Sequence, residues 1–416
     1  MSSRTPDGLD VEFCRSQFPE IGNGWAYLDN AGGSYVPSSV VSRMVAFLTE
    51  SKNQPWRHTA PGKLSGERMD AAHAAIAELI NAERDEVILG PSTTANMFTL
   101  AQALRPMLQP GDEIIVSQQD HEANRGAWVR LAEFGITIVE WPIDPVTGLL
   151  STEVLQGLLN ARTRLVCFTH ASNIVAAINP AAEIARMAHG VGAMVVVDGV
   201  AYAGHALVDV KALDADFYLF SLYKVYGPHQ GVLYASRAAL RHTRNQRHFF
   251  YDGNFTATRL HPAGNQYESV AASQGVADYF DAVYAHHFGG NEPSLHERAK
   301  QVFSLFADQE QALGNALIDG LRALPGVRVL GPQTGDRNVR MPTVAFHVPG
   351  RTSKSIAEAL GSAKCLAGSG HFYAPHCVAA QGIADVDDGV VRISMLHYNT
   401  LAEVQGVLTA LRGILG

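Results

Sequence analysis

Between about residues 85 and 236 the sequence alternates short apolar runs with stretches of helical length, and this alternation constrains the fold more than any other feature. The runs are rich in β-branched and aromatic residues, and several are apolar throughout, as expected for strands covered on both faces. Parallel strands joined by crossover helices produce this pattern. We therefore predict one large α/β domain with strands at 86–90, 113–117, 136–141, 164–170, 193–199, 217–221 and 231–236.

The pattern changes after about residue 290, where a long amphipathic stretch (295–324) is followed by Gly/Pro-punctuated strand candidates. We predict a large domain over residues 41–290 and a smaller α+β domain over residues 291–416. An N-terminal segment, residues 1–40, is expected to join the smaller domain.

Composition excludes several classes of protein. Lys and Arg total 32 against 40 Asp and Glu, and no stretch gathers the basic residues into a stripe, so we expect no nucleic-acid partner. No apolar run approaches the roughly 18 residues of a membrane-spanning helix, and the polar N-terminus is unlike an export signal. Four cysteines without a CxxC pair indicate neither zinc nor disulfides, so we expect a cytoplasmic protein without a metal. The absence of a GxSxG motif disfavours an α/β hydrolase.

Two polar residues stand at the ends of apolar strands. Asp198 ends the run AMVVVD, where open α/β sheets bind their ligands. A buried carboxylate there needs a cation or a protonated ring, although it could also cap the next segment. Lys224 follows FYLFSLY, whose aromatic residues would lower its pKa and make it a nucleophile toward aldehydes. The alternative is a lysine whose amine reaches solvent.

Pyridoxal 5′-phosphate needs such a lysine, an acid at its ring nitrogen and phosphate donors at a helix start. Ser92, Thr93 and Thr94 follow the strand EVILGP and open a helix-like stretch, so their hydroxyls and backbone N–H groups could seat the phosphate. A simple helix cap is the alternative for this triplet. His121 follows another strand and could stack on the cofactor ring, or could be a solvated loop histidine.

The segment 197–234 resembles the cofactor region of class V aminotransferases, the fold-type I group that contains cysteine desulfurases. The likeness extends in order along the chain to YLDNAGG (27–33), GPSTTANM (90–97), DHEANRGAW (120–128), THASNIVAAINP (169–180) and VRISMLHYNT (391–400). The resemblance implies a fold-type I PLP-dependent transferase, with a large domain built on a mostly parallel seven-stranded sheet and a smaller α+β C-terminal domain.

The resemblance also implies roles for individual residues. Lys224 would bind the cofactor as an imine, Asp198 would hold the pyridine nitrogen, and His121 would stack on the ring; these three are the expected catalytic residues. Arg392 would clamp the substrate carboxylate, with Asn30 and Tyr373 also at the substrate. The implied cofactor-binding residues are Ser92, Thr93, Thr94, His121, Asn173, Asp198, Ser221, Tyr223, Lys224 and, from the neighbouring subunit of a homodimer, Asn265.

The chain departs from cysteine desulfurases where they carry their nucleophilic cysteine, in a pattern resembling Gly-His-His-Cys-Ala. The corresponding stretch here is Gly-His-Phe-Tyr-Ala, which places Tyr373 at the cysteine position. Cys377 lies four residues further on, and we interpret it as an ordinary buried thiol. The sequence therefore argues against persulfide transfer.

These features predict a PLP-dependent enzyme that acts on an amino acid by β-elimination, a C–S lyase of an S-substituted cysteine. An aminotransferase, an epimerase or a decarboxylative oxidative deaminase on a cysteine conjugate or another amino acid would use the same residues. In a different class, the chain could be a non-catalytic binding or regulatory protein that retains the fold.

Overall fold

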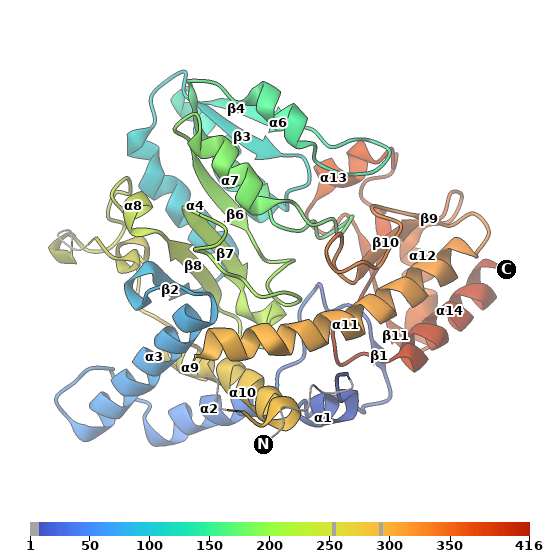
Figure 1. Cartoon of the computed structure of the whole chain (residues 1–416), viewed down its shortest axis with the longest axis horizontal. Helices are drawn as coiled ribbons and strands as arrows, with labels where there is room; N and C mark the ends of the chain where they lie inside the picture. Colours follow the sequence, from blue (N-terminus) through green and yellow to red (C-terminus); the bar gives the residue numbers. More distant parts are fainter. Residues whose placement is uncertain (1–7, 252–254, 291–293) are drawn as a thin grey trace.

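A seven-stranded sheet forms the centre of the computed structural model, which describes residues 8–251, 255–290 and 294–416 (Figure 1). Its strand order is β2-β8-β7-β6-β5-β3-β4; β8 is antiparallel to both neighbours and the other pairs are parallel. All seven predicted strands are confirmed, to within one residue at each end. The strands are β2 Val87–Gly90, β3 Glu113–Ser117, β4 Thr137–Trp141, β5 Thr163–Thr169, β6 Met194–Asp198, β7 Phe217–Ser221 and β8 Gly231–Ala235.

Helices cover both faces of this sheet, as the apolar strands predict. In β6, Val195 and Val197 pack into one hydrophobic cluster with α3 and α7, whereas Val196 packs into another with α4 and α5. The period-two alternation of side chains along a strand produces this division. The helices before β9 are α1 Val11–Ser16, α2 Ser38–Glu50, α3 Ala60–Leu79, α4 Thr93–Leu104, α5 Glu122–Val129, α6 Thr152–Leu158, α7 Ala181–His189, α8 Arg237–Leu240, α9 Tyr267–Ala272, α10 Gln274–Phe288 and α11 Leu295–Arg322.

The C-terminal strands and helices gather at one side of the molecule, drawn in orange and red in Figure 1. A four-stranded sheet has the order β12-β13-β10-β9, and the short strand β1 pairs in parallel with β11. The smaller C-terminal sheet agrees with the predicted fold class, while the domain boundaries stay a prediction. None of the helices in the described ranges is long and apolar enough to cross a membrane. The remaining elements are β1 Ala26–Tyr27, β9 Arg328–Val329, β10 Thr343–His347, α12 Ser353–Ser362, β11 Cys365–Leu366, β12 Gly368–Gly370, α13 Pro375–Ala380, β13 Val390–Ser394 and α14 Leu401–Leu415.

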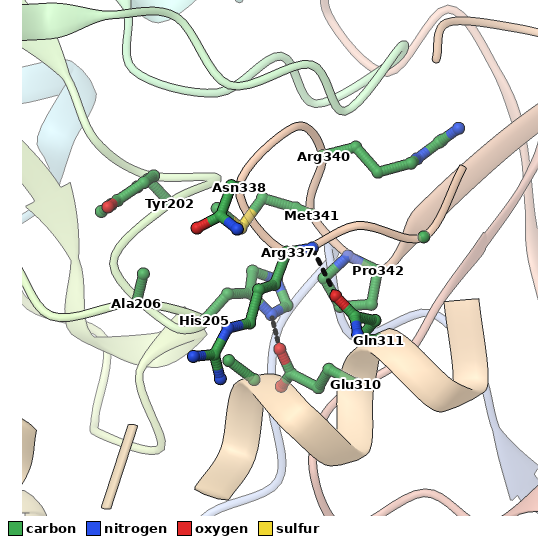
Figure 2. Close-up of a pocket in the computed structure, with 12 residues that line it drawn as sticks. Tyr202, His205, Ala206, Glu310, Gln311, Arg337, Asn338, Arg340, Met341 and Pro342 are labelled. Carbon is green, nitrogen blue, oxygen red and sulfur yellow. Dashed lines mark hydrogen bonds and ion pairs between the residues drawn. The ribbon is translucent and has the colours of Figure 1, made fainter. Parts of the chain in front are cut away.

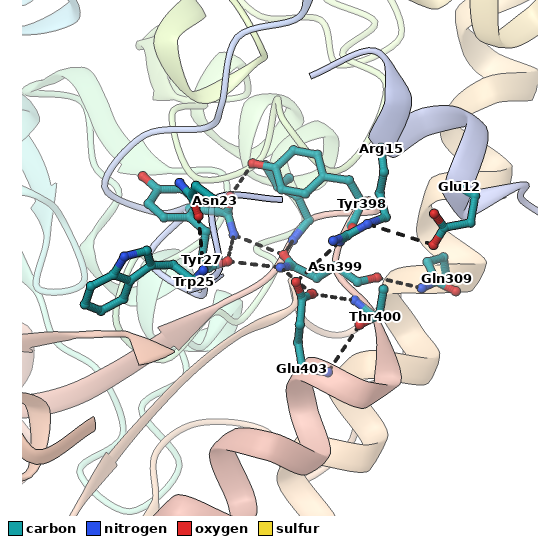
Figure 3. A network of polar contacts seen from close by, with 12 residues as sticks. Glu12, Arg15, Asn23, Trp25, Tyr27, Gln309, Tyr398, Asn399, Thr400 and Glu403 are labelled. Atoms are coloured by element: carbon teal, nitrogen blue, oxygen red, sulfur yellow. Dashed lines mark hydrogen bonds and ion pairs between the residues drawn. The ribbon is translucent and has the colours of Figure 1, made fainter. Parts of the chain in front are cut away.

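A polar network joins the N-terminal segment to the loop between β13 and α14 (Figure 3). The Arg15 guanidinium donates to the carbonyl of Tyr398 at 2.7 Å, and the Asn399 side chain donates to the carbonyl of Tyr27 at 3.0 Å. Thr400 caps α14 in a reciprocal capping box with Glu403. Tyr398 and Asn399 thus hold the N-terminal segment beside β13, the strand that carries Arg392.

Candidate active site

The carboxyl ends of the parallel strands and the start of α4 surround one cavity. Asp198 is the last residue of β6, and Lys224 ends a 3-10 turn that follows β7. Strand ends of an open α/β sheet meet at one edge, which explains how residues far apart in sequence come together. The residues that line this cavity are Thr93, Thr94, His121, Ala123, Thr169, Asn173, Asp198, Val200, Ala201, Ser221, Tyr223 and Lys224.

Burial and mutual charge set the protonation of the two central groups. Burial, together with the Arg392 cation, lowers the pKa of Lys224 to about 8, against the attraction of Asp198. Burial raises the pKa of Asp198 to about 6, although the carboxylate accepts the Val200 N–H at 2.9 Å and faces Lys224. The neutral, nucleophilic fraction of the lysine at pH 7 is therefore about one tenth, far more than for an ordinary lysine. The carboxylate is available to a cationic partner that enters the cavity.

The start of α4 provides hydrogen-bond donors at the same cavity. Thr93 and Ser221 are both buried and lie 2.7 Å apart through their hydroxyl oxygens. A Cβ on Gly231 would come within 2.5 Å of the Thr93 nitrogen, so this glycine lets β8 approach the helix start closely. The hydroxyl of Ser92 instead accepts the Ala95 N–H and caps α4, and Ser92 does not line the cavity. For this residue the structure favours the capping alternative.

His121 and Asn173 reach the cavity from the loops after β3 and β5. The His121 Nδ1 accepts the Ala123 N–H at 3.0 Å, so the neutral ring carries its proton on Nε2. Burial and the nearby cations Lys224 and Arg392 lower the pKa of His121 to about 4. A neutral aromatic ring is the form suited to stacking on a cofactor. Asn173 lines the cavity while its side chain donates to the Phe372 carbonyl at 2.9 Å.

Arg392, on β13, is only 3% exposed and is held from several sides. Its Nη2 lies 3.1 Å from the carboxylate of Asp29, and its Nη1 donates to the Asn173 carbonyl at 3.3 Å. The Phe372 ring covers the guanidinium at 3.7 Å, while the buried Nε has no hydrogen-bond partner. An arginine with an unpartnered buried donor suits a bound carboxylate.

Three other predicted residues lie outside the Lys224 cavity. The amide nitrogen of Asn30 donates to the Ser394 carbonyl and its oxygen accepts from Tyr398, so this side chain positions the loop after β1. Tyr373 is 68% exposed beside the cavity, its ring centroid 5.3 Å from that of His121. Asn265 lines two further cavities of its own chain, and its contribution to a neighbouring subunit stays a prediction.

Sequence reasoning did not identify Asp29, Phe372 or Thr169 as site residues. Asp29 lies within the motif YLDNAGG, which therefore carried a usable signal. Phe372 lies within the stretch Gly-His-Phe-Tyr-Ala, but nothing in that stretch indicates its contact with Arg392, which joins the segment after β12 to the adjacent strand β13.

A second cavity lies between the segment after β6, helix α11 and the loop before β10 (Figure 2). His205, which is partly buried, pairs there with the buried Glu310 at 3.0 Å, and Tyr202 stacks on His170 with ring centroids 3.6 Å apart. None of the described residues that line it is a lysine, so it cannot bind an aldehyde as an imine. The His205–Glu310 pair connects the segment after β6 to α11.

All four cysteines, Cys14, Cys167, Cys365 and Cys377, are free and buried. Burial raises the pKa of Cys377 to about 12, which suppresses the thiolate form. Within the described ranges, no cluster of histidine, cysteine and acidic side chains is arranged to hold a metal ion.

The cavity thus combines a buried lysine of lowered pKa, a strand-end carboxylate, a neutral histidine and hydroxyl groups at a helix start. This donor set fits pyridoxal 5′-phosphate, and on this fold it defines the fold-type I class of PLP enzymes. The model of the family "Aminotransferase class-V" matches residues 26–407, and the chain belongs to this family of PLP-dependent enzymes.

Individual relatives agree with this assignment. The chain is 39% identical to an aminotransferase-like protein of Gibberella zeae, over 98% of this chain and 99% of that protein. It is 33% identical to a cysteine desulfurase-like protein of Aspergillus flavus, over 97% and 90% of the two chains. Among solved structures, a cysteine desulfurase of Thermococcus onnurineus superposes with a TM-score of 0.85 at 23% identity, covering 100% of this chain and 99% of that one.

Proposed function

We propose that this enzyme is a C–S lyase that cleaves the bond between the β-carbon and sulfur of an S-substituted cysteine, without a persulfide on the protein. The observation that carries the proposal is the absence of an accessible thiol near Lys224, Asp198 and Arg392. Tyr373 stands where cysteine desulfurases are expected to have cysteine, and all four cysteines are buried. β-Elimination needs a proton acceptor and an electron sink but no protein thiol.

Pyridoxal phosphate, when bound, supplies an aldehyde for the substrate amine and a cationic ring that accepts electrons from the α-carbon. Asp198, buried at the end of β6, would hold a proton on the ring nitrogen of the bound cofactor. Lys224, with a pKa lowered to about 8, is suited to remove the α-proton as a neutral amine. Arg392 orients the substrate through its carboxylate, and Asp29 and Phe372 fix the plane of the guanidinium.

The bond changes balance without an external oxidant. The α-proton passes to the Lys224 nitrogen, the Cβ–S bond breaks, and the thiolate leaves with the bonding electrons and is protonated. Water then hydrolyses the remaining unsaturated amino acid. One S-substituted cysteine and one water give a thiol, pyruvate and ammonium.

The test is to incubate the purified yellow holoenzyme with S-alkyl cysteines and to measure thiol and pyruvate together. Equal amounts of both products are expected, with loss of activity and of the borohydride-reducible cofactor linkage in Lys224→Ala. Lys211, which is half-exposed and pairs with Glu83 at 3.4 Å, is the matched control, and Lys211→Ala should retain both. A reducible linkage that persists in Lys224→Ala refutes the assignment of the lysine.

The other outcomes separate the alternatives. Keto acid without thiol indicates transamination, loss of optical activity indicates epimerisation, and release of carbon dioxide indicates decarboxylative deamination. Cofactor binding without turnover of any amino acid indicates a binding or regulatory protein.

We also propose a homodimer in which each subunit completes the phosphate site of the other through Asn265. The position of Asn265 outside its own Lys224 cavity supports this arrangement. The test is to mix Lys224→Ala with Asn265→Ala subunits. Because one mixed dimer then contains an intact site, activity above that of either variant alone is expected.

A further inference from the structure

The segment Gly370–Tyr373 follows an unusual backbone path beside the active site. Phe372 and Tyr373 have φ angles of 46° and 58°, in the left-handed region that residues other than glycine avoid. Such conformations persist only where the surroundings over-determine them, and they cluster at functional sites.

Hydrogen bonds hold this segment against the large sheet. The Tyr373 carbonyl accepts the Glu122 N–H at 2.6 Å, and the Phe372 carbonyl accepts from the Asn173 side chain at 2.9 Å. The Tyr373 N–H donates to the Nδ1 of His371 at 3.1 Å. Glu122 is the first residue of α5 and Asn173 belongs to the loop after β5, so the segment is attached at two points beside the cavity.

The two aromatic side chains have different surroundings. Phe372 covers the Arg392 guanidinium at 3.7 Å and is partly buried. Tyr373 lies beside His121, with an angle of 42° between the ring planes, and leaves 68% of its surface exposed. One ring thus supports the carboxylate clamp, and the other presents a free aromatic surface next to a residue that lines the cavity.

We propose that Tyr373 is a specificity-determining residue that packs against the group on the substrate's β-carbon, and that the enzyme prefers a ring-bearing group there. This inference rests on the proposed function, because it takes the substrate to be a β-substituted amino acid. An amino acid held through its carboxylate at Arg392 and its α-carbon at Lys224 would place its side chain near this segment, because Phe372 covers Arg392 and Tyr373 lies beside His121, which lines the Lys224 cavity. An aromatic group there pairs with the Tyr373 ring and covers its exposed surface.

The test compares S-benzyl-L-cysteine with S-methyl-L-cysteine in the holoenzyme. Binding is followed by the change in cofactor absorption, which does not depend on the later reaction, and kcat/KM is measured alongside. We expect the parent to prefer the benzyl compound, Tyr373→Ala to reduce that preference roughly 2- to 10-fold, and Tyr373→Phe to retain it. Phe134, another exposed aromatic residue, provides the control Phe134→Ala, which should leave the preference unchanged. Circular dichroism and cofactor content verify that each variant folds.

The inference is overturned if Tyr373→Ala keeps the parent's preference, or if Tyr373→Phe loses as much preference as Tyr373→Ala. The proposed function can fail separately. If neither probe releases a thiol but the benzyl preference in binding still depends on Tyr373, the lyase assignment is wrong and the specificity role stands. If both probes release thiol equally well in the parent and in Tyr373→Ala, the lyase assignment stands and the specificity role is wrong.

Discussion

The burial of Asp198 carries a cost in the cofactor-free protein that can be measured. Burial raises its pKa from the ordinary 3.8 to about 6. One pKa unit corresponds to about 1.36 kcal/mol, so a shift of about two units lowers the unfolding free energy of the ionised protein by roughly 3 kcal/mol. The raised pKa means that the folded state binds the proton more tightly than the unfolded state. Stability is therefore lost as the pH rises from about 4 to about 6 and the carboxyl ionises.

Asp198→Asn removes this charge and keeps an oxygen that can accept the Val200 N–H. We expect the cofactor-free variant to exceed the parent in unfolding free energy by about 3 kcal/mol above pH 7. Near pH 4 the two proteins should differ little, because in the folded state both side chains are then neutral and the carboxyl of the unfolded parent is only partly ionised. The same variant should lose most catalytic activity, since the ring nitrogen loses its anionic partner.

Urea unfolding of the cofactor-free proteins at several pH values between 4 and 8 measures the effect. Asp319→Asn on α11 is the control, because Asp319 is exposed and its replacement should change the unfolding free energy by less than about 0.5 kcal/mol. A gain that is absent, or that is as large at pH 4 as at pH 8, would refute the reasoning about Asp198.

Three further predictions concern other parts of the site. Gly231→Ala places a Cβ within 2.5 Å of the Thr93 nitrogen, so we expect it to lower the unfolding free energy by about 1–3 kcal/mol and to weaken cofactor binding measured by equilibrium dialysis. The control Gly157→Ala, whose Cβ would have no atom within 4 Å, should leave the unfolding free energy unchanged or raise it slightly. Arg392→Lys removes the planar guanidinium that can bind a carboxylate through two N–H groups, so we expect KM to rise about 10-fold or more with a smaller effect on kcat. An unchanged KM in steady-state kinetics would contradict the role of Arg392 in binding the substrate carboxylate. Iodoacetamide should leave the native enzyme active and its cysteines unmodified, whereas in urea it should label all four cysteines. Mass spectrometry counts the labels, and rapid labelling of Cys377 in the native enzyme would contradict its burial.

Several parts of the structure could be predicted because local sequence encodes them. The apolar runs of β3 and β7 can be buried only as strands covered on both faces, and their predicted bounds agree with the structure. Asp198 and Lys224 could be identified because Asp198 ends an apolar run and Lys224 follows another. The resemblance to the family contributed Asn173 and Arg392, which no local pattern identifies.

By itself, the sequence determined the strand and helix pattern, the cofactor class and the lack of a cysteine at the desulfurase position, because these depend on residue identity and on short-range order. Only the tertiary structure decided which groups share the site. Asp29 and Phe372 meet Arg392 only after β1, β12 and β13 assemble. The left-handed backbone at Phe372 and Tyr373 depends on hydrogen bonds from Asn173 and from the start of α5, about 200 and 250 residues earlier in the chain. Contacts between segments so distant arise from packing of whole elements, and no short stretch of sequence encodes them.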